Sequence, residues 1–129
     1  MIIYLDYDGT MVEHMWPLDG PPTPHSVEVC LKLQEKNYKF ILNTKRVELD
    51  RPALQRSLDY LWKSGLKIST VRAIKIEPTF WNIHENMEIL FLDDLASGIP
   101  LMRSTVAIPP MVDWRKVEKE LKKIGRAHV

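Results

Sequence analysis

Short apolar runs that end in polar residues alternate along the chain with longer amphipathic stretches. A continuous apolar run is typical of a buried strand in a parallel sheet, whereas apolar residues at helical spacing indicate a helix. The predicted strands cover residues 2–5, 40–42, 71–76, 88–92 and 104–108. The predicted helices cover residues 24–36, 54–62 and 113–124, the first capped by Thr23 and the second closed by Gly65.

This alternation of strands and helices with short links predicts an α/β fold. Each right-handed crossover between parallel strands lays its helix across a face of the sheet. We therefore expect a three-layer α/β/α sandwich, Rossmann-like, with a central parallel sheet of about five strands. At 129 residues the chain can bury one core but not two, so a single domain over residues 1–129 is predicted.

The segment between the first strand and the first helix, residues 11–23, is rich in proline and glycine. These residues break helices and favour turns, which predicts an irregular loop or a small hairpin flap. Residues 44–71 have room for only one helix and its links. Neither segment is long enough for an added cap domain, so a site beside them should be open.

Composition and charge indicate where in the cell the protein is expected. Apolar residues make up 45% and charged residues 27%, and the net charge of +1 gives no global attraction to nucleic acid or membranes. The lysines of the last helix alternate with glutamates, which is typical of a solvated face. A lone cysteine, Cys30, excludes an internal disulfide and is expected in the core. With no signal-peptide pattern and no apolar stretch of membrane-spanning length, we expect a cytoplasmic protein.

Polar side chains follow three of the predicted strands at the point where each strand ends. In chain order they are Asp6 with Asp8, Thr44, and Asp93 with Asp94. Ligands of open α/β sheets bind at this carboxyl edge. Four carboxylates there would repel one another strongly unless a divalent cation lay between them, and oxygen ligands favour magnesium over zinc. The sequence therefore predicts a Mg²⁺ site at this edge.

Residues 3–10, with the sequence IYLDYDGT, resemble the first motif of the haloacid dehalogenase (HAD) superfamily. Residues 41–44, ILNT, look like the second motif of that family, a lysine like the third, and residues 91–94, FLDD, like the fourth. The motifs follow in the family's order and span residues 3–94. The resemblance implies a HAD-like fold and a small capless phosphatase, a hydrolase that uses Mg²⁺.

The resemblance also implies roles for the aspartates. Asp6 would be the nucleophile that forms an aspartyl phosphate, and Asp8 would protonate the leaving group and later activate water. The metal ligands would be the Asp6 carboxylate, the main-chain carbonyl of Asp8, and an acid of the fourth motif. Asp93 is favoured over Asp94 as the direct ligand, with Asp94 acting through water or a hydrogen bond.

Phosphate binding is assigned to main-chain amides after the nucleophile and to polar side chains of the second and third motifs. The predicted contacts are Tyr7, Gly9, Asn43, Thr44 and Lys75. Gly9 would let the backbone bend away from the phosphate. Lys75 would neutralise the nucleophile and the phosphate, with Lys67 as the alternative, because the length of a lysine side chain lets either reach the site.

Other side chains are assigned more ordinary roles. We expect the four histidines to lie on the surface, because they share no metal-ligand spacing: His14, His25, His84 and His128. Lys45 and Arg46 are predicted to be solvated charges, with contact to a substrate anion as the alternative. Trp16 in the flap is a candidate for packing or for substrate contact, and with Trp81 it is expected to be exposed.

Two other functions compete with the phosphatase hypothesis. A receiver domain also gathers acids, a threonine and a lysine around Mg²⁺, but its isolated phosphoacceptor follows the third strand, where this chain has Lys75. A binding or scaffold protein could keep the fold without the chemistry. The physiological substrate is not defined by the motifs. An open site would suit a bulky phosphate ester, such as a nucleic-acid end or a phosphoprotein, or a homo-oligomer in which a neighbouring subunit forms the lid.

Overall fold

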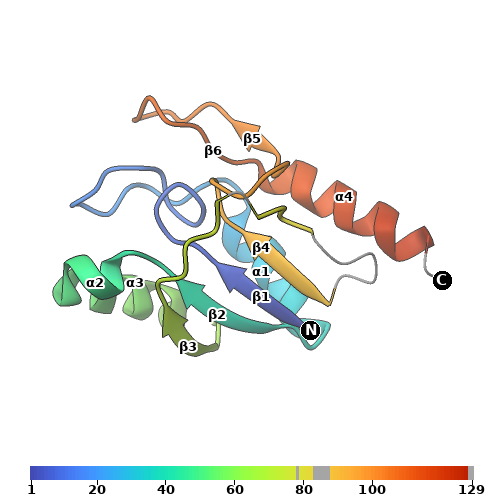
Figure 1. Ribbon diagram of the computed structural model, residues 1–129, viewed down its shortest axis with the longest axis horizontal. Coiled ribbons are helices and arrows are strands. Elements are labelled where there is room, and N and C mark those ends of the chain that lie inside the picture. The colour runs from blue at the N-terminus through green and yellow to red at the C-terminus, as the bar shows by residue number, and fades with distance from the viewer. Residues whose placement is uncertain (78, 83–87, 128–129) are drawn as a thin grey trace.

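The computed structural model describes residues 1–77, 79–82 and 88–127, so the predictions for His84 and His128 lie outside the described residues. Within these ranges the chain forms six strands and four helices (Figure 1). In order they are β1 (Ile2–Leu5), α1 (Ser26–Glu35), β2 (Lys39–Asn43), α2 (Arg46–Leu49), α3 (Arg51–Lys63), β3 (Ile68–Arg72), β4 (Ile89–Leu92), β5 (Leu101–Met102), β6 (Met111–Val112) and α4 (Trp114–Ala127). None of the described helices combines the length and the apolar character that a membrane span requires.

The centre of the protein is a four-stranded sheet in the order β3-β2-β1-β4. All three strand pairs are parallel, and in register Leu5 of β1 lies between Leu42 of β2 and Leu92 of β4. The predicted α/β fold with a central parallel sheet is confirmed. The sheet has four strands rather than about five.

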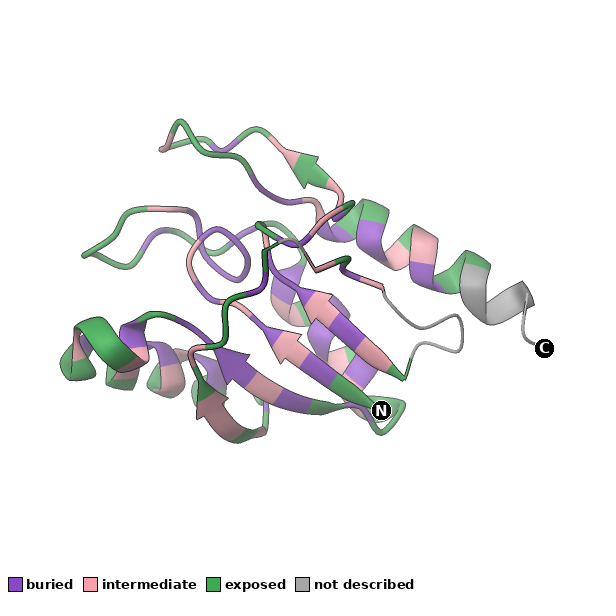
Figure 2. Cartoon of the chain, viewed as in Figure 1, coloured by how far each residue is buried: buried purple, intermediate pink, exposed green. Residues whose placement is uncertain are grey.

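Alternating strand residues separate the two faces of the sheet (Figure 2). One set is fully buried and forms the core: Ile3, Leu5, Phe40, Leu42, Leu90 and Leu92. The other set, which includes Tyr4, Ile41 and Phe91, is only half-buried, and the Tyr4 and Phe91 rings stack at 5.0 Å. Both crossovers toward β3 run in the same direction, so α1 and α3 cover the same face, behind the sheet in Figure 1. Ion pairs join α4 to α1, so these two helices lie side by side.

Two predicted strands are wrong in position. The third strand is residues 68–72 instead of 71–76, because the Asn43 side chain bonds both main-chain groups of Ile74 and draws this segment out of the sheet. Residues 104–108 form no strand, because the Glu13 carboxylate accepts hydrogen bonds from the Thr105 amide and from the Ser104 hydroxyl. Instead β5 and β6 make a small antiparallel ribbon apart from the main sheet.

Helix starts also differ from prediction. Thr23 does not cap α1, because its hydroxyl donates to the Thr10 carbonyl and His25 occupies the cap position with a φ of 66°. The second predicted helix begins earlier, at residue 51, where the Asp50 carboxylate accepts the Ala53 amide. The short helix α2 precedes it and was not predicted. The last helix, 114–127, extends past the predicted end at residue 124.

Residues 11–23 form the small hairpin flap that the sequence predicted. The Glu13 amide donates to the Pro21 carbonyl and the Thr23 amide donates to the Met11 carbonyl, which ties the two arms together. The buried Glu13 carboxylate fastens the flap to the loop at Ser104. The flap is therefore held from both sides and lies above the carboxyl edge of the sheet (Figure 1).

Candidate functional site

The carboxyl ends of β1, β2 and β4 open into one cleft of about 700 Å³. Its lining includes most of the side chains predicted for the site: Asp6, Asp8, Asn43, Thr44, Lys75, Asp93 and Asp94. Lys67 is elsewhere, at the opposite end of β3, in a surface pocket with Leu58 and Trp62. Of the two candidate lysines, Lys75 is therefore the one that borders the cleft.

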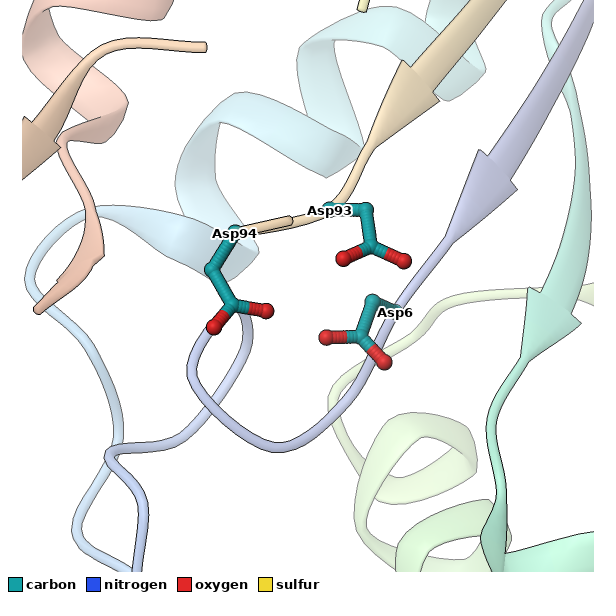
Figure 3. A group of neighbouring side chains, drawn as sticks. All are labelled: Asp6, Asp93 and Asp94. Carbon is teal, nitrogen blue, oxygen red and sulfur yellow. The ribbon is translucent and has the colours of Figure 1, made fainter. Parts of the chain in front are cut away.

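Asp6, Asp93 and Asp94 form an acidic triad. One carboxylate oxygen from each lies within 4.8 Å of those of the other two, and the side chains point into a common space (Figure 3). Asp6 directly follows β1, and the other two directly follow β4. The Thr10 hydroxyl joins the two loops, because it donates to the Asp6 carboxylate at 3.1 Å and accepts the Asp94 amide at 3.1 Å.

The electrostatics of the triad are unfavourable without a cation. Burial raises the pKa of Asp6 well above its ordinary value, and the charges of Asp93 and Asp94 raise it further, against a smaller lowering by the Tyr7 amide. Burial likewise raises the pKa of Asp93 to about 6, although the Leu95 amide opposes this. Three mutually repelling oxygen donors at one point are the arrangement that a hard divalent cation stabilises.

Asp8 stands apart from the triad. Both of its carboxylate oxygens accept hydrogen bonds from Arg46, Oδ2 from Nε at 2.9 Å and Oδ1 from Nη2 at 2.8 Å. Arg46 is only 1% exposed, and its Nη1 also donates to Asp19 at 2.6 Å and to the Ala53 carbonyl at 2.8 Å. The prediction of a solvated Arg46 is therefore wrong. It is a buried cation that fixes the orientation of Asp8.

The predicted phosphate contacts divide into two groups. Thr44 borders the cleft, where its hydroxyl oxygen accepts the Arg46 amide at 3.2 Å, and the exposed Lys75 borders it on the other side. Asn43 is committed elsewhere, because its amide holds the main chain of Ile74 at 2.9 and 2.7 Å. We infer that Asn43 positions the Lys75 segment rather than contacting phosphate.

Tyr7 turns its side chain away from the cleft. The ring is buried in the core, where the Arg46 guanidinium lies 4.7 Å from its centroid and Tyr60 meets it edge-on. Only its main-chain amide remains a candidate for phosphate binding, as the sequence suggested. Trp16 is 41% exposed in the cleft, but Trp81 is only 4% exposed, so the expectation of an exposed Trp81 is wrong.

His14 is a site residue that the sequence did not reveal. Its Nε2 lies 2.8 Å from the Asp94 carboxylate, 80 positions away, so no local pattern could have found it. The contact passes directly over Gly9, whose φ is 83°. A Cβ at Gly9 would lie 2.1 Å from His14 Nε2 and 2.7 Å from Asp94 Oδ2. Glycine is therefore required here both for the backbone conformation and for the close approach.

Comparison with known proteins gives the fold and no more. The sequence matches no protein-family model and no curated protein. The fold is similar to a solved structure, that of a conserved protein coded by a locus from Bacteroides thetaiotaomicron, with a TM-score of 0.62 and 24% sequence identity. The match covers 95% of this chain and 90% of that chain. The chemistry must therefore be argued from the site itself.

Proposed function

We propose that this protein is a magnesium-dependent phosphohydrolase of the HAD type, which acts on a phosphomonoester through an aspartyl phosphate on Asp6. The observation that carries the proposal is the acidic triad at the carboxyl edge of the sheet. One of its members, Asp6, is the residue to which the sequence motif gives the role of nucleophile. Thr44 and Lys75 border the same cleft, where they could donate to a phosphate.

The residues present fit a magnesium ion. All of the donors are carboxylate oxygens, which Mg²⁺ prefers, and burial together with the neighbouring carboxylates raises the pKa values of Asp6 and Asp93. When bound, the ion would neutralise charge on the nucleophile and the phosphate. The triad includes Asp93 and Asp94 alike, so both are candidate ligands.

The chain's own residues supply the remaining steps. A carboxylate oxygen of Asp6 attacks phosphorus, the bond from phosphorus to the leaving oxygen breaks, and Asp8 gives that oxygen a proton. Asp8 then accepts a proton from the water that attacks the aspartyl phosphate. This second step restores Asp6 and releases inorganic phosphate. Lys75 would offset the negative charge of the transferring phosphoryl group.

The ion pair between Asp8 and Arg46 favours a second candidate function. Both oxygens of Asp8 accept hydrogen bonds from Arg46, and we propose that Asp8 turns away from Arg46 when it exchanges a proton with a substrate. A protein that binds Mg²⁺ and a phosphate group without hydrolysis would have no need of that turn. This alternative is a phosphate-binding scaffold with the same fold.

Turnover of a phosphomonoester panel separates the two functions. We expect hydrolysis with Mg²⁺, Mn²⁺ or Co²⁺ that Asp6→Asn abolishes, because the variant loses the charged nucleophile and nearly keeps its shape. Asp59→Asn is the matched control, since Asp59 is exposed on α3 and bonds only Gln55 among the described contacts. If folded wild-type protein hydrolyses nothing on the panel, the scaffold function is favoured.

The proposed setting is the cytoplasm, where phosphorylated substrates are abundant. Between β1 and α1 the chain has only the flap, and between β2 and β3 only α2, α3 and their links. No cap domain encloses the cleft in these segments. This openness supports a bulky phosphate ester as substrate, such as a nucleic-acid end or a phosphoprotein, or a homo-oligomer in which a second subunit completes the cleft.

A further inference from the structure

The mouth of the cleft carries an apolar rim, which we define as Trp16, Leu49, Ile74 and Leu95. These side chains are 41%, 63%, 50% and 52% exposed, and all of them line the cleft that contains the acidic triad. They come from four separate segments of the chain. Exposed apolar side chains that gather beside a polar site are characteristic of a binding surface rather than of ordinary solvated surface.

Trp16 is the member of this rim that contacts a buried cation. The Arg46 guanidinium lies 5.3 Å from its ring centroid, and Arg46 is itself fixed by Asp8 and Asp19. Arg56 also holds the flap, because it donates to Asp19 at 3.0 Å and to the Pro17 carbonyl at 3.2 Å. The guanidinium lies over one face of the indole, so the 41% of Trp16 that remains exposed is available for stacking.

Two lysines at the rim can pair with a phosphate group. Lys45 and Lys75 are exposed and line the same cleft, which the exposed Glu48 and Glu77 and the acidic triad also line. An anionic group would bind on this side, through the lysines and a metal held by the triad. An apolar group attached to it would reach the rim. The cleft, at about 700 Å³, has room for both parts of such a molecule.

We propose that Trp16 stacks against a flat aromatic group of the substrate while the lysines and the triad bind its phosphate. The assignment rests on the proposed function and adds the class of substrate, a phosphomonoester that carries an aromatic or heteroaromatic ring. A flat ring fits because an indole face offers dispersion and quadrupole contacts over its whole area, which a narrow alkyl chain cannot match. Leu49, Ile74 and Leu95 then cover the edges of the bound ring.

Binding of stable phosphonates tests this class without requiring turnover. We compare naphthylmethylphosphonate with propylphosphonate in the presence of Mg²⁺, using calorimetric titration of the wild-type protein. We expect the aryl compound to bind roughly tenfold more tightly, within the range of measured ring stacking on aromatic side chains. A comparison of the affinities for adenosine 5′-monophosphate and ribose 5-phosphate then locates the ring. Tighter binding of the nucleotide indicates a nucleobase, and equal binding indicates a ring attached close to the phosphorus.

Two variants locate the effect. Trp16→Leu should remove the aryl preference and leave propylphosphonate binding unchanged, whereas Trp16→Phe should keep most of the preference. Trp62→Leu is the matched control, because Trp62 is 76% exposed on α3 and lines a different pocket. Equal affinity of the wild type for both phosphonates overturns the proposal, as does an equal loss of both in Trp16→Leu. If the protein prefers the aryl phosphonate but hydrolyses no phosphomonoester, the stacking proposal stands and the proposed hydrolysis is contradicted.

Discussion

Asp93 offers a direct test of the cation site through the stability of the protein. Its ordinary pKa is 3.8, and burial raises this to about 6 in the folded state. The folded protein therefore holds this proton more tightly than the unfolded chain does. Stability of the metal-free protein should fall as the pH rises from about 4 to about 6, and it should remain low above that range. The raised pKa of Asp6 acts in the same direction.

The size of the effect follows from the two pKa values of Asp93. At about 1.4 kcal/mol per pH unit, the full difference is about 3 kcal/mol, and the part between pH 5.0 and pH 7.5 is about 1.4 kcal/mol. Urea unfolding in a chelator at these two pH values measures it. Added Mg²⁺ should stabilise the protein more at pH 7.5 than at pH 5.0, because protons compete with the metal for the triad at the lower pH.

Variants show whether the triad causes the effect. Asp93→Asn should flatten the pH dependence by the Asp93 contribution and reduce the stabilisation by Mg²⁺, whereas Asp59→Asn should leave both unchanged. A metal-free wild type that gains stability from pH 5.0 to pH 7.5 would contradict the electrostatic argument. An increment from Mg²⁺ that is absent, or equal at both pH values, would refute the cation site.

Three further perturbations test the surroundings of the triad. Lys75→Ala should lower turnover roughly 100-fold or more, because it removes charge next to the transferring phosphoryl group, while Lys67→Ala should change turnover little. Gly65→Ala should lose about 1–2 kcal/mol of unfolding free energy because its φ is positive, and Gly9→Ala should lose more, because its φ is positive and its Cβ would also collide with His14 and Asp94. Only Gly9→Ala should also weaken Mg²⁺ binding in calorimetry, since a Cβ at Gly65 meets nothing nearer than 3.6 Å. Burial raises the pKa of Glu13, but hydrogen bonds from Thr105 and Ser104 outweigh this and hold the pKa below its ordinary value. Glu13→Gln should therefore destabilise the protein by about 1–3 kcal/mol at pH 7, and urea unfolding should show the difference shrinking as the pH falls through the lowered pKa.

The sheet and much of the cleft could be predicted because their signals are local. The strands β1, β2 and β4 are continuous apolar runs, and each run ends where a polar side chain begins the loop. Parallel pairing then brings the ends of the strands to one edge without further information. Asp6, Thr44 and Asp93 therefore share a cleft in the structure, as their positions in the sequence indicated.

The two misplaced strands have a common cause, which is a distant side chain that bonds a main-chain group of the segment. Residues 73–76 are as apolar as a strand, yet Asn43 binds the main chain of Ile74 and removes it from the sheet. Glu13 does the same to Ser104 and Thr105, across 91 and 92 positions. The pattern of apolar residues in a segment indicates whether the segment can pair as a strand. It carries no information about a distant side chain that binds the main-chain groups of that segment.

The contact between Asp8 and Arg46 shows what a motif leaves out of a proposed reaction. Turning Asp8 toward a substrate breaks two hydrogen bonds to a guanidinium, and a charged hydrogen bond contributes roughly 1.5–3 kcal/mol. A buried cation left unpaired would make the turn still more unfavourable. Arg46 avoids this state, because it keeps its bonds to Asp19 and to the Ala53 carbonyl when Asp8 leaves. Asp19 belongs to the flap. The flap that presents Trp16 therefore also supplies the carboxylate that neutralises Arg46 while Asp8 moves.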